Sequence, residues 1–157
     1  MNGRGLSNNS LKFLFPKIDE VLNCKVYRGT LNIYTNRPII IDWKYNLIRN
    51  PESRLFFNAQ INGVPCILTR WNSAPLHVFE IIACVKLRDW LNLDQYDEVE
   101  ITIDEHKIQK TPIFLVLLWN IYWKKREYLF YTNWYKYLVD KTLLHNYFFS
   151  SIRYFRK

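Results

Sequence analysis

The sequence predicts a mainly β fold, a small barrel or sandwich with a few short helices. Three observations predict it. Short apolar runs recur between turn-forming residues, Asn62-Gly63 joins two of these runs, and residues 98–103 alternate between polar and apolar side chains. An Asn-Gly pair between apolar runs signals a tight hairpin, and alternation with period two is typical of a half-buried strand. Many short strands with few helices favour a barrel or a sandwich.

The elements are expected in the following order. Residues 1–10 form a loop, and a helix follows over residues 14–22, where Leu14, Ile18, Val21 and Leu22 recur at helical spacing and Pro16 suits the first turn. Strands are expected at residues 30–34, 38–42, 55–61, 64–70, 78–83 and 98–103, and a short helix at residues 86–93. The 157 residues are enough for one domain with a core of its own.

Composition changes along the chain, and we expect two parts, residues 1–105 and residues 106–157. The first part holds twelve Lys or Arg and twelve Asp or Glu, whereas the second holds ten and two, so the second part accounts for the whole net charge of +8. The second part also carries fifteen of the 27 aromatic residues. Such a break indicates two parts with different roles.

Cys24, Cys66 and Cys84 are widely spaced and form no CxxC pair. This spacing indicates neither a zinc site nor a disulfide framework. Their neighbours are apolar, so we expect three buried free thiols, which fits a reducing cytoplasm. No pattern typical of a secretory signal opens the chain, and we expect a cytoplasmic protein.

Three segments carry a resemblance to a known family. They are residues 26–33 (Val-Tyr-Arg-Gly-Thr-Leu-Asn-Ile), residues 80–89 (Glu-Ile-Ile-Ala-Cys-Val-Lys-Leu-Arg-Asp) and residues 91–101 (Leu-Asn-Leu-Asp-Gln-Tyr-Asp-Glu-Val-Glu-Ile). In this order they resemble the archaeal-type CTP-dependent riboflavin kinases, whose second segment reads Glu-Ile-Ile-Ala-Pro. The resemblance covers residues 1–105 and implies a small closed β-barrel of the cradle-loop type that phosphorylates riboflavin to FMN, with residues 106–157 as a helical extension.

The resemblance assigns a magnesium ion to Thr30 and Asn32. A threonine hydroxyl and an asparagine carbonyl two residues apart on a strand point the same way, and magnesium prefers such hard oxygen ligands. By resemblance they hold Mg²⁺ against the phosphates of CTP, in a reaction that depends mainly on positioning and charge. The alternative is that Gly-Thr-Leu-Asn is an ordinary turn entering a strand.

By resemblance the nucleotide contacts two further segments. One is the terminal loop Gly3, Arg4 and Gly5, which matches a glycine-rich loop of the family but lacks its last glycine and arginine. Glycines let backbone N–H groups approach phosphate closely. The other is the start of the short helix, made of Val85, Lys86, Leu87 and Arg88, where N–H groups and two cations suit a phosphate. The alternatives are a disordered terminus and a solvated helix face.

Glu80 interrupts the apolar strand at residues 78–83, so its carboxylate is expected to face a cavity or to be paired. By resemblance it contacts the ribityl chain of the flavin, accepts a hydrogen bond from the 5′-hydroxyl and helps to remove its proton. Ser73 stands in for a flavin-contacting threonine, and His77 lies near a family histidine. The alternatives left open place Glu80 on the solvent face of an edge strand and His77 on the polar surface.

Residues 113–149 hold almost no helix breakers and predict one to three helices. The apolar run at residues 113–123 is too short to span a bilayer. The basic, aromatic extension is interpreted in three ways: packing on the barrel or a second subunit, an interfacial membrane helix, or nucleic-acid binding. No nucleic-acid motif accompanies the charge. We therefore expect a peripheral membrane or protein contact through residues 113–157 and no nucleic-acid partner.

The sequence thus predicts a CTP-dependent riboflavin kinase with Mg²⁺ as its cofactor and riboflavin, FMN, CTP and CDP as its ligands. One alternative is a catalytically weakened barrel that keeps only nucleotide or flavin binding. The other is a membrane-surface or interaction protein that acts through its C-terminal extension.

Overall fold

The computed structural model describes residues 11–49, 54–71, 74–94 and 97–126, and within them the chain is mainly β. The helices are α2 (Phe15–Leu22), α3 (Leu87–Trp90) and α4 (Ile113–Tyr122), with 3₁₀ turns η1 (Trp43–Tyr45) and η2 (Glu105–Lys107). The strands are β1 (Leu31–Tyr34), β2 (Ile40–Ile41), β3 (Arg54–Ile61), β4 (Val64–Trp71), β5 (Val78–Ile82), β6 (Ile101–Thr102) and β7 (Ile108–Gln109).

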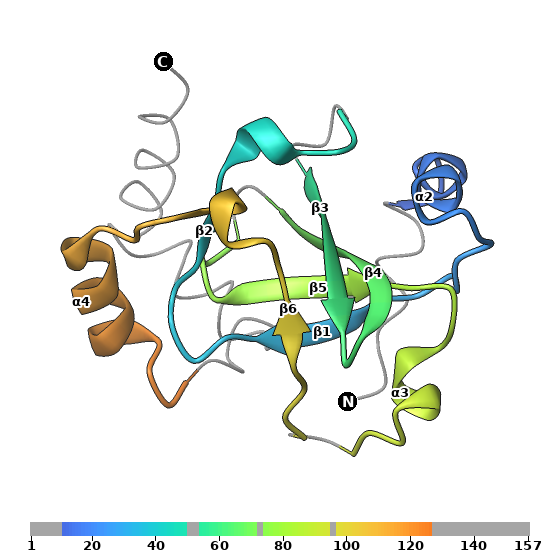
Figure 1. The fold of residues 1–157 in the computed structure, drawn as a ribbon. Coiled ribbons are helices and arrows are strands. Elements are labelled where there is room, and N and C mark those ends of the chain that lie inside the picture. The colour runs from blue at the N-terminus through green and yellow to red at the C-terminus, as the bar shows by residue number, and fades with distance from the viewer. Residues whose placement is uncertain (1–10, 50–53, 72–73, 95–96, 127–157) are drawn as a thin grey trace.

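Five strands form one antiparallel sheet in the order β1-β5-β4-β3-β6, and β2 pairs with β7. Figure 1 shows that the long strands β3 and β4 curve, so that the sheet curls into a half-barrel. The mainly β fold predicted from the sequence is confirmed. Among the described residues β1 and β6 are the two edges of this sheet, and the closed barrel of the cradle-loop type stays a prediction.

The hairpin between β3 and β4 is the one that the sequence predicts. Asn62 has a φ of 46° and Gly63 a φ of 79°. A two-residue turn with positive φ at both positions matches the right-handed twist of the two strands, and only Asn, Asp and Gly adopt that backbone readily. This turn sets the register in which Ile61 faces Val64 and Phe57 faces Leu68.

Side chains alternate between the two faces of the sheet. On the concave inner face, apolar side chains from β3, β4 and β5 pack into the main core, which includes Phe57, Cys66, Leu68, Phe79 and Ile81. The opposite, outer face is partly covered by α2. There Phe56, Ile67 and Ile82 pack against the helix in a second cluster, and Pro16 begins the helix as expected.

The predicted strands are confirmed, most of them with shorter bounds. Of the strand expected at residues 98–103 only Ile101–Thr102 pairs with β3, and the helix expected at residues 86–93 is the single turn α3. The pairing of β2 with β7 was not foreseen, because two-residue strands are too short to show a period.

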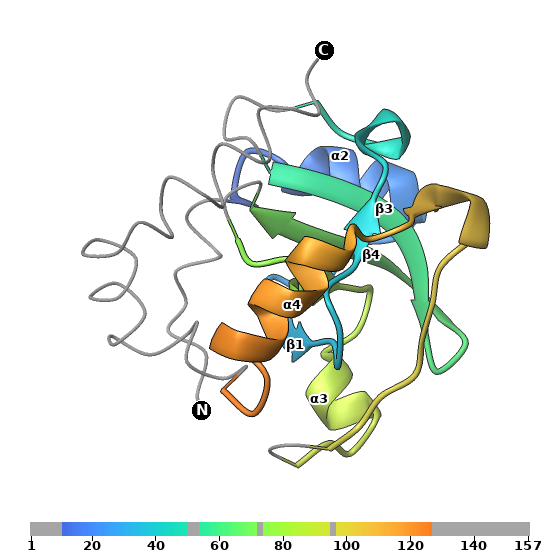
Figure 2. The same ribbon diagram turned by 90° about the vertical axis from the view of Figure 1, so that its left-hand side faces the viewer.

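The first helix expected in the C-terminal extension is present as α4. In Figures 1 and 2 it lies at the end of the molecule opposite α2. The division of the chain at residue 105 stays a prediction.

Candidate functional site

The outer face of the sheet carries a row of polar side chains across three neighbouring strands. Asn32 on β1 lies opposite Glu80 on β5, and Glu80 lies opposite Thr69 on β4. Residues that face each other in an antiparallel pair have their side chains on one side of the sheet. The structure therefore brings together Asn32 and Glu80, which the sequence analysis selected from segments almost 50 residues apart. Thr30 lies two positions before Asn32, at the entry to β1.

Glu80 is buried and ion-paired. It is 7% exposed and belongs to a strand between β1 and β4, so the alternative of a solvent-facing edge position is wrong. Nη2 of Arg54 lies 3.1 Å from Oε1 of Glu80, and Nη1 lies 3.4 Å from Oε2. A buried carboxylate needs such a partner, because an uncompensated charge in the interior is strongly destabilising. The expectation that this carboxylate is paired is confirmed.

Arg54 is a candidate site residue that was not predicted from the sequence. It begins β3 and reaches across β4, where its guanidinium carbon lies 4.3 Å from the centre of the Trp71 ring. Only 1% of the residue is exposed. Beside it the Thr69 hydroxyl donates to the carbonyl oxygen of Leu55 at 2.7 Å. The available signal was the alternation along β3, which places Arg54 on the same face as Phe56, but its partner on β5 is set by the tertiary fold.

The resemblance assigns residues 85–88 to nucleotide binding. Two side chains of this segment belong to the core and two are exposed. Leu87 is buried and Val85 half-buried, and both belong to the main core. Any contact of these two residues with a nucleotide would therefore come from their backbone. Lys86 and Arg88 are exposed, and Lys86 pairs with Asp89 at 2.8 Å. This hydrogen bond with Asp89 raises the pKa of Lys86, which keeps its charge at neutral pH.

Two comparisons with known proteins identify the family. The family model of the CTP-dependent riboflavin kinases, described as a domain of unknown function, DUF120, matches residues 2–103. The chain belongs to this family. The riboflavin kinase of Pyrobaculum aerophilum is 34% identical over 116 residues, which cover 64% of this chain and 55% of that protein. The chain thus spans about half the length of this curated relative.

The region matched by the riboflavin kinase family contains the whole polar row, because Thr30, Asn32, Arg54, Thr69 and Glu80 all lie within it. Helix α4 begins ten residues after residue 103 and lies beyond the match. The candidate site is therefore built by β1, β3, β4 and β5, all of which lie within the match.

A disulfide joins Cys24 to Cys84, with 6.0 Å between the two Cα atoms. The prediction of three free thiols is wrong for these two residues. They are 60 positions apart, and they meet because the chain after α2 runs back beside the end of β5, where the Tyr27 N–H donates to the Ala83 carbonyl at 2.9 Å. No spacing rule reveals such a contact. Cys84 also stands where the family pattern has a proline.

Cys66 is free and buried, as expected. Burial raises the pKa of its thiol to about 12, so it stays protonated at neutral pH. Of the three cysteines, only Cys66 keeps the free thiol that fits a reducing compartment, and the cytoplasmic location stays a prediction.

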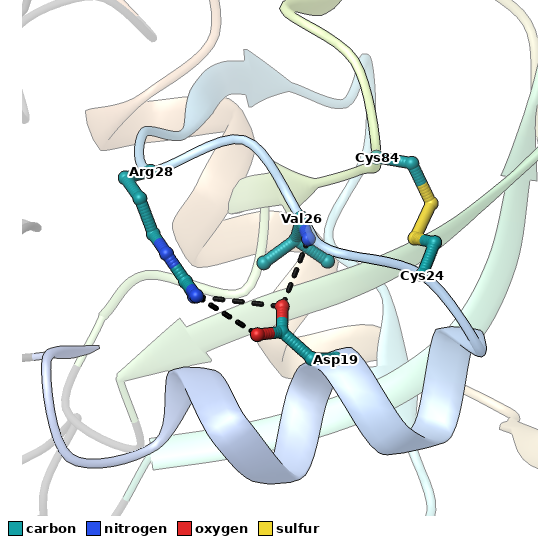
Figure 3. The surroundings of a disulfide bond; sticks show 5 residues. All are labelled: Asp19, Cys24, Val26, Arg28 and Cys84. Carbon is teal, nitrogen blue, oxygen red and sulfur yellow. Dashed lines mark hydrogen bonds and ion pairs between the residues drawn. A yellow bond between two sulfur atoms is a disulfide. The ribbon is translucent and has the colours of Figure 1, made fainter.

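Asp19 fixes the segment that leads from the disulfide to β1 (Figure 3). Its carboxylate accepts the Val26 N–H at 2.8 Å and pairs with the Arg28 guanidinium at 2.8 Å. Partial burial alone would raise the pKa of Asp19, but these hydrogen bonds outweigh it and lower the pKa below its ordinary value of 3.8. Arg28 in turn lies 4.4 Å from the ring of Phe15 on α2. The approach to Thr30 is therefore held by charged contacts and a covalent bond.

His77 is completely buried, so the alternative of a polar surface residue is wrong. Its ring lies 5.0 Å from the ring of Trp123 and 6.2 Å from that of Trp119, measured between centroids. Trp119 belongs to α4, and Trp123 directly follows this helix. The C-terminal extension thus packs on the start of β5, three residues before Glu80.

Four predicted site residues, Gly3, Arg4, Gly5 and Ser73, lie outside the described residues. In the part of the chain that the structure describes, no group of three or more His, Cys, Asp or Glu could hold a metal ion. Thr30 and Asn32 still fit magnesium, because the ion accepts neutral oxygen ligands and takes the rest of its shell from substrate phosphates and water. Asn32 is exposed and can be reached by such a ligand.

Proposed function

We propose that the chain is a CTP-dependent riboflavin kinase, which transfers the γ-phosphate of CTP to the 5′-hydroxyl of riboflavin and yields FMN and CDP. The observation that carries the proposal is the register of β1 and β5. It places the proposed metal ligand Asn32 directly opposite the proposed acceptor-binding residue Glu80, within the region that matches the family.

Four residues of the candidate site have proposed roles. Thr30 and Asn32 hold Mg²⁺, which neutralises charge on the phosphates when it is bound. Glu80 accepts a hydrogen bond from the 5′-hydroxyl of riboflavin and directs that oxygen toward the γ-phosphorus. The Arg54 guanidinium, 3.1 Å from Glu80, fixes the position of this side chain, and Glu80 orients the hydroxyl and receives its proton as the new P–O bond forms.

The remaining assignments come from the family pattern. Gly3, Arg4, Gly5, Lys86 and Arg88 surround the nucleotide, with Val85 and Leu87 contributing backbone N–H groups, and Ser73 contacts the flavin. The proposed preference for CTP over ATP rests on the name of the matching family model.

The test is an assay of FMN formation with riboflavin, Mg²⁺ and either CTP or ATP. We expect product with CTP, and we expect Thr30→Ala and Asn32→Ala each to lower turnover by about tenfold or more, or at least about 1.4 kcal/mol in the barrier. Asn58→Ala is the matched control, because Asn58 is an exposed asparagine on β3 and lies, like Asn32, on the outer face of the sheet. Equal turnover of the unaltered protein and the three variants would contradict the assignment of Thr30 and Asn32 as metal ligands.

A second candidate is a barrel that binds flavin or nucleotide without turnover. The observation that favours it is the shortened glycine loop, in which Leu6, Ser7 and Asn8 replace the family's last glycine and arginine. Quenching of riboflavin fluorescence on titration with the protein, without FMN formation from CTP or ATP, would establish this second function in place of the first.

A further inference from the structure

One face of helix α4 packs on the rest of the domain. Leu115, Trp119 and Trp123 recur every fourth residue and are buried, and the two tryptophans pack on His77. Residues three or four apart lie on the same side of a helix. This side fixes α4 to the domain.

The other face of α4 is an exposed apolar strip. We call it the α4 strip, and its members are Ile113 (75% exposed), Phe114 (51%), Leu117 (57%) and Ile121 (67%). The polar residue on this side, Asn120, donates from its amide nitrogen to the Val116 carbonyl oxygen of its own helix at 2.8 Å. The strip therefore offers almost no hydrogen bonds to water. A contiguous exposed apolar patch of this kind marks an interaction surface.

Positive charges flank both ends of the α4 strip. Lys110 precedes the helix, and Lys124, Lys125 and Arg126 follow it, all of them exposed. Between His106 and Arg126 the sequence contains no Asp or Glu. The segment thus combines large apolar side chains with cations and contains no acidic residue, which is the composition of helices that lie on anionic membranes.

Charge also decides between the occupants of this surface. A second copy of the chain would bring the same cations together across the interface, where like charges repel. Residues 127–157 carry five Lys or Arg and two Asp or Glu, so they have a net positive charge as well. Neither a second copy nor residues 127–157 would complement the charge of the flanking cations. A layer of anionic lipid headgroups complements them, and the acyl chains below the headgroups accept the apolar strip.

We propose that the α4 strip and its flanking cations form a docking surface for an anionic lipid membrane, with α4 lying along the membrane surface. Among the described residues no helix is long and apolar enough to cross a bilayer. The apolar side chains enter the boundary between headgroups and acyl chains, while the lysines and the arginine remain at headgroup level. This surface lies outside the family match and does not depend on the proposed kinase activity.

Sedimentation of the full chain with vesicles tests the proposal. We expect binding to vesicles that contain phosphatidylglycerol at low ionic strength, weaker binding at high salt, and little binding to vesicles of phosphatidylcholine alone. No sedimentation with the anionic vesicles at low salt would overturn the proposal, and so would equal binding to the two vesicle types.

Paired variants locate the surface. Changing both Lys124 and Arg126 to Glu should lower vesicle binding by about tenfold or more. The control changes Lys12 and Lys17 to Glu, which alters the net charge equally at exposed positions near α2, far from α4 (Figures 1 and 2). Equal losses in the two variants would mean that net charge, and not this surface, drives binding, which contradicts the proposal.

The apolar part is tested by changing both Leu117 and Ile121 to Ser, with Phe13→Ser as a control at another exposed apolar residue, 84% exposed. We expect about a tenfold loss or more for the former, since each buried aliphatic side chain contributes substantially to binding, and no loss for the control. Gel filtration identifies the competing occupant. If the chain elutes as a dimer that the two serines convert to a monomer, without an effect on vesicle binding, the strip is an interface between copies and the proposal is wrong.

Discussion

The two faces of the central sheet are built from the same strands but are stabilised in different ways. The inner face is a mainly apolar core in which Phe57, Leu68 and Ile81 pack, and the buried Arg70 guanidinium at this face lies 5.4 Å from the centre of the Phe79 ring. The outer face carries a buried ion pair between Arg54 and Glu80 and receives its other supports from outside the sheet. These supports are helix α2, the Asp19 contacts and a disulfide.

We propose that this difference separates residues that specify the fold from residues that carry the proposed chemistry. A buried ion pair seldom stabilises a protein more than apolar residues of the same size would, because both charges must be removed from water. We therefore propose that the pair between Arg54 and Glu80 is retained for function and not for stability. Variants on the two faces should accordingly affect stability and turnover in different proportions.

The largest expected effect on stability belongs to the inner face. Phe57→Ala should lower the free energy of unfolding by about 3–5 kcal/mol, because it removes a 1% exposed side chain and leaves a cavity. Denaturant unfolding measures this loss. Turnover per folded molecule should stay unchanged below the melting transition, and a specific loss of turnover would contradict the separation of the two faces.

The next effect concerns the ion pair. Arg54→Met should destabilise the protein by about 3 kcal/mol, toward the lower end for a broken buried pair because the Glu80 side chain keeps 9% exposure. Changing Arg54 to Met and Glu80 to Leu together should restore most of the stability, since no charge is then left unpaired. Turnover should be lost in both variants. A double variant that keeps its turnover would show that the pair is structural.

Reduction of the disulfide should have an effect on stability of about the same size. The bond closes a loop between residues 60 positions apart, and its loss should cost roughly 2–4 kcal/mol. The variant with both Cys24 and Cys84 changed to Ser should unfold at the same denaturant concentration with and without reductant, while the unaltered chain should shift. Cys66→Ser is the control that keeps the bond. If reductant does not change the unfolding of the unaltered chain, the expectation is contradicted.

The smallest effect is expected at Asp19 and depends on pH. Because its pKa is lowered in the folded protein, its ion pair adds stability above the ordinary Asp pKa of 3.8, and this stability disappears as the pH falls through the folded-state value. Asp19→Asn keeps an acceptor for the Val26 N–H but loses the charge. The variant should be less stable at neutral pH and equally stable in strong acid. A difference that persists at low pH would assign the effect to packing.

Much of the outer face could be predicted from local sequence, but the contacts between its distant residues could not. The period-two strands, the Asn62-Gly63 turn and the separate selection of Asn32 and Glu80 each depend on short stretches of chain. The Arg54 contact and the disulfide depend on which strands become neighbours, and residues 26 or 60 positions apart leave no trace of that in a single sequence. The alternatives for His77 stayed open for the same reason, because α4, which packs on it, begins more than 30 residues later.

The bond between Cys24 and Cys84 has one more consequence. Strands β1, β3, β4 and β5 all lie within the closed covalent ring that it forms. A protease cut anywhere from Lys25 to Ala83 would therefore leave two pieces that migrate together on a non-reducing gel and separate only after reduction. The strands that carry the proposed site would stay tethered even when one of the loops that connect them is severed.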